Sequence, residues 1–366
     1  MEVPLLINDF LRRAAKLYPT KTAIVDGDLR LTYRDFQARV NQLGHALIRL
    51  GVKKGDRVCI LSPNSHYFLE SYYGVTQIGA ILVPLNYRLV ASDHEYIINH
   101  AGVKAVLVDY EFTGVIDEIR PSLKSVEHWI AADPRAGHET PAGWIDWDVL
   151  VSNQPKTATP HVEQDENDVT SINYTSGTTA RPKGVMLTHR NLQTMGLCYF
   201  VDVDPVAADD AIVYGAPMSH GAGIYAIPHL MAGARHVVPT SGGVDPAELF
   251  ALGRTLGPLS TFAAPTIVKR LVDYAEEAGL RPRIILPVPV LSPRLSSHWV
   301  SLVTPLPRSL ARPLVGSLVN EVIVKDDAIL AICKGVRLSY RESVRLALAS
   351  TRAHDVTTRW SGADGE

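Results

Sequence analysis

Short apolar runs alternate with helix-length amphipathic segments from residue 22 to about residue 280, and this alternation constrains the fold more than any other feature. Residues 22–26, 57–61 and 104–109 are apolar runs of the length that buried strands have. Residues 33–50, between the first two runs, carry apolar side chains at the spacing of a helix. Strands that alternate with helices form largely parallel sheets covered on both faces. The sequence therefore predicts an α/β fold.

The neighbouring segments extend this pattern. Residues 67–79 and 94–101 are predicted helices, and residues 80–84 are a predicted strand between them. Residues 1–19 have the spacing of an amphipathic helix and lack the basic start, apolar core and cleavage site of a signal peptide. Residues 133–168 contain several prolines and acidic residues, so we expect a loop or a linker between subdomains there.

Composition and charge exclude several classes of protein. Hydrophobic residues make up 46% of the chain and charged residues 20%, which is ordinary for a globular enzyme. A net charge of -2 offers no basic surface for nucleic acid, and no apolar run is long enough to be a transmembrane segment. The three cysteines, Cys59, Cys198 and Cys333, have no metal-ligand spacing. We expect buried thiols and a cytoplasmic protein.

One segment carries the residue types of a phosphate-binding loop. Small residues let backbone N–H groups approach a polyphosphate, hydroxyl groups add donors, and a lysine supplies positive charge. After a predicted strand that begins at residue 172, the candidate phosphate-binding residues are Thr175, Ser176, Gly177, Thr178, Thr179 and Lys183. A helix is predicted to begin at Thr188 or His189 and to run to about Tyr199.

This loop differs from the Walker loop of P-loop ATPases. The Walker pattern needs glycine directly before the lysine and serine or threonine directly after it. Here Pro182 precedes Lys183 and Gly184 follows it. The alternative reading is a surface turn rich in serine, threonine and glycine, but the ordered run with Pro-Lys-Gly and a strand on either side favours phosphate binding.

The loop resembles the signature of the AMP-dependent synthetases and ligases, the adenylate-forming superfamily. Within that superfamily the chain looks most like the fatty acid and other carboxylic acid–CoA ligases. The resemblance extends to about residue 279 through residues 31–36, 54–58, 79–86, 216–223 and 262–266. It implies mixed sheets flanked by helices, as in the N-terminal subdomains of the large domain of these enzymes, here incomplete and without the C-terminal lid domain.

The resemblance also implies a reaction and its ligands. A carboxylate would attack the α-phosphate of ATP to give an acyl-adenylate and pyrophosphate, and the thiol of CoA would then displace AMP. Residues 175–179 and Lys183 would hold the β- and γ-phosphates, with Mg²⁺ as a further cofactor. The family usually has glycine or serine where this chain has Ala180. If that position needs a positive φ, alanine would strain the loop by about 1 kcal/mol.

His220 matches the family position that lies between the substrate carboxylate and the thiol tunnel. The resemblance implies a catalytic role for it, and a structural histidine is the alternative. Residues 221–223 and 262–266 match regions near the acyl pocket, where packing in the core is the alternative reading.

The later motifs of the family do not occur in this chain. They are a Tyr-Gly-x-Thr-Glu segment whose glutamate serves Mg²⁺, a Thr-Gly-Asp segment for the ribose, an arginine-rich hinge and a closing lysine. Residues 283–320 hold six prolines and no aspartate or glutamate. We therefore expect a family region over 1–281 and a divergent tail over 282–366, with 282–320 poorly packed. Out-of-frame translation would explain such a tail, and a short natural variant is the alternative.

These observations leave three functions open. The first is an ATP-dependent carboxylic acid–CoA ligase by ancestry, inactive as this chain because it lacks the contacts to Mg²⁺, ribose and adenylate. The second is a residual nucleotide- or acyl-binding pseudoenzyme, or a fragment without function. The third is another adenylating enzyme, which would need a carrier protein or an aspartate for an amino acid substrate.

Overall fold

The computed structural model describes residues 4–133, 137–175 and 181–279. Contacts divide the chain into two units, and all of these residues except Gly279 belong to the first. The predicted boundary between residues 281 and 282, and the predicted poor packing of residues 282–320, lie outside the described residues and stay predictions.

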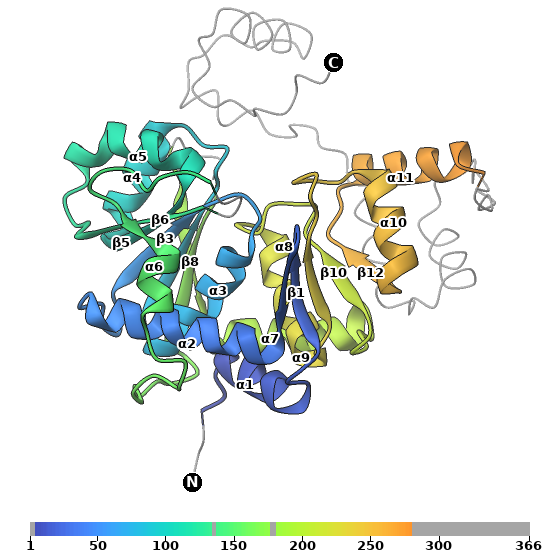
Figure 1. Cartoon of the computed structure of the whole chain (residues 1–366), viewed down its shortest axis with the longest axis horizontal. Helices are drawn as coiled ribbons and strands as arrows, with labels where there is room; N and C mark the ends of the chain where they lie inside the picture. Colours follow the sequence, from blue (N-terminus) through green and yellow to red (C-terminus); the bar gives the residue numbers. More distant parts are fainter. Residues whose placement is uncertain (1–3, 134–136, 176–180, 280–366) are drawn as a thin grey trace, which may run out of the picture. The chain divides into compact units, whose positions relative to one another are not determined.

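Two β-sheets form the frame of this unit (Figure 1). The smaller sheet is parallel except for the antiparallel pair β1–β2, and its strand order is β12 (Leu259–Thr261), β10 (Ala211–Val213), β11 (Arg235–Val238), β1 (Thr22–Asp26) and β2 (Leu29–Thr32).

The larger sheet is parallel except for the antiparallel pair β8–β9. Its strand order is β7 (Ile145–Asp146), β6 (His128–Ala132), β5 (Val103–Asp109), β3 (Arg57–Leu61), β4 (Ile81–Leu85), β8 (Val169–Thr175) and β9 (Lys183–Thr188). Strand β9 ends this order. Mixed sheets with helices between their strands confirm the α/β fold class.

The helices that alternate with these strands follow the chain in order. They are α1 (Ile7–Leu17), α2 (Tyr33–Arg49), α3 (His66–Gly74), α4 (Ala91–Ala101), α5 (Thr113–Ile119), α6 (Trp147–Ser152), α7 (His189–Asp202), α8 (Gly221–Ile224), α9 (Ala226–Ala232), α10 (Pro246–Leu256) and α11 (Pro265–Glu277).

Helix α2 forms where the sequence pattern places it. The Thr32 side chain accepts a hydrogen bond from the Asp35 N–H, and the Asp35 side chain accepts one from the Thr32 N–H, which satisfies both donors at the helix start. The apolar residues of the helix are buried at helical spacing: Phe36, Val40, Leu43 and Leu47. This buried face holds α2 against α1 and α3.

The two sheets share one hydrophobic core. Ile24 and Ile212 of the smaller sheet belong to the same buried cluster as Ile60 and Leu82 of the larger one. Helix α3 joins them by hydrogen bonds as well, because Asp26 at the end of β1 accepts from the His66 N–H at 2.8 Å. The segments that follow β3 and β10 are therefore held in fixed relation to one another.

A buried ion pair ties α2 to α3 within this core. The Glu70 side chain has no exposed surface, and its Oε1 lies 2.5 Å from Arg39 Nε. Arg39 also contacts the half-exposed Asp148 of α6 at 2.9 Å. Asp148 in turn accepts a hydrogen bond from the Tyr67 hydroxyl. The three helices are thus linked by one charged network.

The structure corrects two expectations from the sequence. The predicted loop over residues 133–168 contains a short strand and helix α6, because the Asp146 side chain caps the helix and Trp147 and Val151 bury one face of it. Cys59 is buried as expected, but Cys198 is exposed because it lies on the outward side of α7. Cys333 lies outside the described residues.

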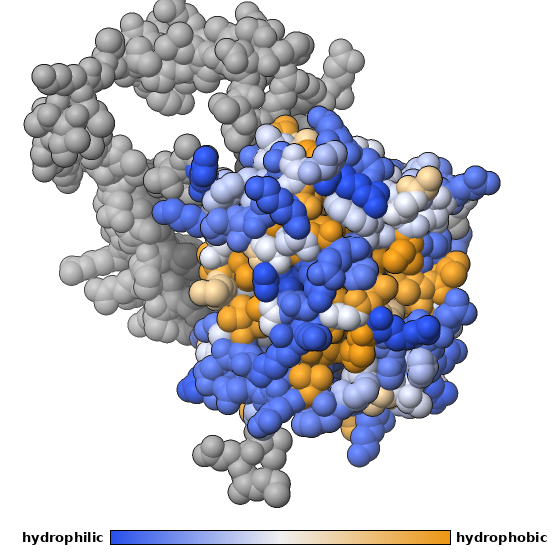
Figure 2. All heavy atoms as spheres, turned by 90° about the vertical axis from the view of Figure 1, so that its left-hand side faces the viewer, coloured by the Kyte–Doolittle hydropathy of each residue, from blue (hydrophilic) through white to orange (hydrophobic). Residues whose placement is uncertain are grey.

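Hydrophilic residues cover much of the surface on the side of α4 and α5, with apolar residues visible between them (Figure 2). Within residues 4–133, 137–175 and 181–279, no helix is long and apolar enough to cross a membrane.

Candidate functional site

The predicted phosphate loop joins the two strands of the β8–β9 hairpin. Thr175, the last residue of β8, pairs with Lys183, the first residue of β9, and Tyr174 pairs with Gly184. Both Thr175 and Lys183 are exposed. Ser176, Gly177, Thr178, Thr179 and Ala180 lie outside the described residues, so their predicted contacts stay predictions.

Lys183 has surroundings unlike those of Lys54 and Lys104. Lys54 and Lys104 lie against carboxylates, Lys54 at 2.7 Å from Asp168 and Lys104 at 3.2 Å from Asp56. No described carboxylate forms an ion pair with Lys183. Its ammonium group is therefore available to an anionic ligand.

Helix α4 contacts the hairpin on both sides of the loop. On the β8 side, the Tyr174 hydroxyl and His100 Nδ1 lie 2.7 Å apart. On the other side, the Arg181 guanidinium lies over the Tyr96 ring, 5.6 Å from its centre. Burial raises the pKa of Tyr174, so its hydroxyl stays protonated at neutral pH. These contacts fix the ends of the loop against a helix of the larger sheet.

The segment after the hairpin begins as the sequence predicts. Thr188 caps α7 in a reciprocal pair with Asn191, and α7 runs from His189 to Asp202. The buried His189 ring accepts a hydrogen bond from the Ile7 N–H through Nδ1 and donates one to Gln164 Oε1 through Nε2, each at 3.2 Å. Burial lowers the pKa of His189 to about 4, so the neutral ring makes both bonds. The hairpin is thereby linked to α1.

His220 lies at the end of a loop that leaves β10 and is held by Asn64. The Asn64 side chain donates to the carbonyl oxygens of Tyr214 and Ala216 and accepts from the Met218 N–H, at 2.7–2.9 Å. His220 itself is exposed, and its ring Nδ1 lies 2.9 Å from the hydroxyl oxygen of its neighbour Ser219. Burial of part of the ring lowers its pKa, and the positive charge of Arg88 lowers it further.

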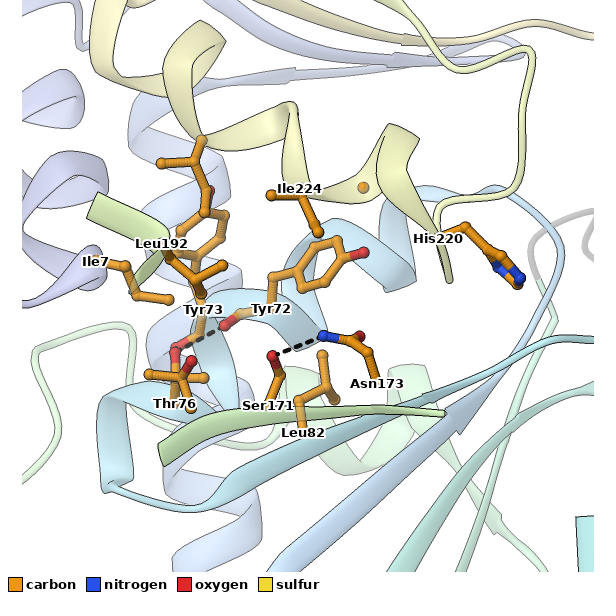
Figure 3. Close-up of a pocket in the computed structure, with 13 residues that line it drawn as sticks. Ile7, Tyr72, Tyr73, Thr76, Leu82, Ser171, Asn173, Leu192, His220 and Ile224 are labelled. Carbon is orange, nitrogen blue, oxygen red and sulfur yellow. Dashed lines mark hydrogen bonds between the residues drawn. The ribbon is translucent and has the colours of Figure 1, made fainter. Parts of the chain in front are cut away.

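A small cavity of about 30 Å³ lies beside His220 (Figure 3). It is enclosed by β8, α3, α8 and neighbouring helices, and mostly apolar side chains line it. The lining residues are Ile7, Tyr72, Tyr73, Thr76, Leu82, Thr170, Ser171, Asn173, Leu192, His220, Gly223, Ile224 and Ile227.

The regions predicted near an acyl pocket lie close to this cavity. Gly223 is part of its lining. A methyl group at Gly221 would lie 3.3 Å from the ring of Phe262, so these two residues pack together. His220 and Gly223 therefore come together at one cavity, and Phe262 lies behind Gly221.

Sequence reasoning missed two residues of this site, Asn64 and Tyr72. Asn64 follows β3, and the carboxyl ends of parallel strands are where open α/β sheets place their ligand sites. That rule could have singled out Asn64. Tyr72 lies inside a predicted helix and carries no local signal. Among the described residues, no three or more His, Cys, Asp or Glu side chains are placed to hold a metal ion.

The two mixed sheets and this hairpin form a fold that is also found in a solved N-terminal domain. The structure matches the inhibitor-bound N-terminal domain of FACL13 from Mycobacterium tuberculosis with a TM-score of 0.66 at 28% identity, covering 81% of this chain and 73% of that one. The sequence profile described as AMP-binding enzyme matches residues 11–324. The chain belongs to the AMP-binding enzyme family.

Two further comparisons place the chain among longer relatives. It is 34% identical to a long-chain-fatty-acid–CoA ligase of Thermus thermophilus over 77% of this chain and 51% of the relative. It shares its fold with ATP-bound MatB from Rhodopseudomonas palustris, with a TM-score of 0.61 at 24% identity over 73% of this chain and 51% of that one. MatB holds ATP in that structure, and the chain spans about half the length of the curated relatives it matches.

Proposed function

We propose that this chain is the phosphate-holding half of an ATP-dependent carboxylic acid–CoA ligase, and that it binds polyphosphate without turning over. The loop 175–183 binds the β- and γ-phosphates of ATP, and a carboxylic acid lies beside His220. The observation that carries this proposal is the unpaired Lys183 opposite the exposed Thr175 at the end of the hairpin.

The chemistry of the family assigns a task to each part of this site. A carboxylate oxygen bonds to the α-phosphorus of ATP, and the bond to pyrophosphate breaks. Lys183 balances the negative charge of the leaving phosphates, and the hairpin holds them in line with the attacking oxygen. The CoA thiol then bonds to the acyl carbon, and AMP leaves. Mg²⁺ would supply further positive charge at the phosphates.

Three features support the residues chosen for these tasks. Helix α4 contacts the residues at both ends of the loop, so Lys183 lies on a strand that is held in place. Asn64 fixes the chain that leads to His220. Partial burial lowers the pKa of His220 below its usual value, so the ring at this site is mostly neutral at pH 7.

Titration calorimetry with pyrophosphate and with ATP tests the binding step. The protein should bind both weakly, and ATP should show little advantage over GTP, because the adenine and ribose contacts belong to motifs that the sequence lacks. Lys183→Ala removes one charged contact, for which about 1.5–3 kcal/mol is typical, so binding should weaken about 10- to 100-fold.

Lys156→Ala is the matched control, since Lys156 is an exposed lysine in the loop after α6. It removes the same charge and should leave pyrophosphate binding unchanged. Equal binding by the protein and by Lys183→Ala would refute the phosphate site.

The second part of the proposal is tested by an acyl-CoA assay with ATP, CoA and a carboxylic acid. Only background formation of acyl-CoA is expected. Turnover at ordinary ligase rates that Lys183→Ala abolishes would show that the remaining residues supply the missing contacts.

A further inference from the structure

One face of strand β8 lies toward the cavity beside His220. Successive residues of a strand point to opposite faces of the sheet. Ser171 and Asn173 line the cavity, and Figure 3 shows both side chains on the side of the strand that faces it. Thr175, two residues further along β8, points to the same side. We call this side of the hairpin the ligand face.

The opposite face of the hairpin, the packed face, lies against the core. Ile172 and Tyr174 both pack on the buried cluster that contains residues of α4 and α5. Paired residues of two neighbouring strands share a face. Tyr174 pairs with Gly184, so Gly184 belongs to the packed face. Thr175 pairs with Lys183, so Lys183 belongs to the ligand face.

The Tyr174 ring fills the space beside Gly184. A methyl group at Gly184 would lie 3.2 Å from Cζ of Tyr174 and 2.7 Å from a methyl carbon of Ile172. A residue with a side chain at this position would therefore push the tyrosine ring away. The ring as it lies brings the Tyr174 hydroxyl to 2.7 Å from His100 Nδ1 on α4.

The His100 ring has a second aromatic neighbour on the same helix. It stacks on Tyr96, one turn earlier in α4, with ring centres 5.3 Å apart and an angle of 25° between the planes. The Arg181 guanidinium lies 5.6 Å from the centre of the same Tyr96 ring. The group that meets the Tyr174 hydroxyl is therefore held by its own helix, although His100 is exposed.

We propose that Tyr174 is a positioning residue for phosphate binding, through its bond to His100 and the fit of its ring beside Gly184. Because α4 holds the packed face, the side chains of Lys183 and Thr175 are directed to the ligand face. The inference rests on the proposed function, which assigns phosphate binding to these two residues. It also gives a physical reason for the glycine that follows the lysine: only glycine leaves room for the ring.

Calorimetry with pyrophosphate measures the effect on the phosphate site. The full chain is compared with Tyr174→Phe, which loses only the hydroxyl, and with His100→Leu, which loses the nitrogen that meets it. Each variant should bind about two- to fivefold more weakly, because the two groups form one neutral hydrogen bond at an exposed position. The double variant should bind as weakly as either single variant, since both changes remove the same bond.

Three more variants separate positioning from a general loss of structure. His100→Asn keeps an acceptor, because its amide oxygen is attached to the same Cγ atom as Nδ1, and it should keep the affinity that His100→Leu loses. Gly184→Ala displaces the ring and should weaken binding at least as much as Tyr174→Phe. Tyr110→Phe is the matched control: Tyr110 stacks on His138 outside the hairpin, so this variant should bind pyrophosphate like the unchanged protein.

Amide hydrogen exchange without ligand reports on the hairpin itself. Residues 169–175 and 183–188 should exchange faster in Tyr174→Phe and in His100→Leu than in the unchanged protein, whereas His100→Asn should not differ from it. The free energy of unfolding in urea should change little in these variants, because the bond is exposed.

The two measurements distinguish this inference from the proposed function. Unchanged exchange in Tyr174→Phe and His100→Leu, or equal pyrophosphate affinity in all variants, would overturn the role of Tyr174 and leave the phosphate site standing. Absence of pyrophosphate binding by the unchanged protein would refute the phosphate site, and the positioning role with it. If circular dichroism shows that Gly184→Ala is unfolded, Tyr174→Phe still decides the result, since it adds no atom to the packed face.

Discussion

Replacing Arg39 with methionine should destabilise the protein more than its partly exposed position suggests. Arg39 keeps about a quarter of its side chain exposed, whereas its partner Glu70 has none exposed. The second oxygen of Glu70, Oε2, is buried and has no hydrogen bond among the described residues. Arg39→Met therefore leaves a buried carboxylate without its counter-ion.

The magnitude follows from the burial of the two partners. Breaking a buried ion pair by removing one partner typically costs about 3–5 kcal/mol. The lost contact to the half-exposed Asp148 adds at most about 1 kcal/mol. Arg39→Met combined with Glu70→Leu removes both charges and leaves two apolar groups. That double variant should recover at least about 2 kcal/mol relative to Arg39→Met alone.

Urea unfolding measures these free energies, followed by circular dichroism and by tryptophan fluorescence. Trp147 reports on this region, because its buried ring lies 5.0 Å from that of Tyr67 next to the charged network. Arg12→Met is the control: it removes an arginine from an exposed pair with Asp9 on α1 and should cost no more than about 0.5 kcal/mol.

Two results would refute this reasoning. A cost below about 1 kcal/mol for Arg39→Met would mean that Glu70 finds water or another partner. A double variant no more stable than Arg39→Met would mean that the arginine stabilises the core by packing its stem and not by its charge.

Two further predictions concern histidine and glycine. The pKa of His189 is about 4 in the folded protein and 6.5 when exposed, so between these values only the unfolded chain binds the proton. The contribution of His189 to the free energy of unfolding is therefore fully present above pH 6.5, and it falls by up to about 1.4 kcal/mol per pH unit as the pH drops toward 4. In urea titrations at several pH values, the free energy of unfolding of His189→Gln should depend less steeply on pH than that of the unchanged protein. An equal pH dependence in the two proteins would contradict this. Gly223→Ala should cost about 1–3 kcal/mol because its methyl group meets the backbone of Met218, whereas Gly114→Ala, with open space around it, should be neutral or slightly stabilising in the same urea titration.

Local periodicity was sufficient to predict most elements of the fold. Strand β3 has the predicted bounds Arg57–Leu61, and α2 differs from the predicted helix by one residue at its end. Both segments carry their signals within themselves, as apolar runs, helical spacing and a capping pair. Helix α6 was missed because its six residues are too few for a period to stand out from the surrounding prolines and acidic residues.

The contacts that shape the site could not be predicted in this way. Tyr72 meets a carbonyl 146 positions later in the chain, and His189 meets the N–H of Ile7, 182 positions earlier. Neither contact can be recognised from the spacing of nearby residues, because both contacts depend on how the sheets and helices pack. The phosphate-loop residues form a contiguous motif, so the sequence could single out Lys183, whereas the wall of the cavity needed the structure.

Strand β9 has a consequence for how the protein behaves at high concentration. Among the described residues it is the outermost strand of its sheet, it carries Lys183, and its Val185 and Met186 are 45% and 65% exposed. An outer strand with apolar side chains is a surface on which two molecules can pair. Self-association along β9 would cover Lys183, the proposed phosphate ligand. Self-association and polyphosphate binding therefore compete with each other by mass action. Polyphosphate should then act as a solubilising agent, and dilute samples should show the higher affinity for it.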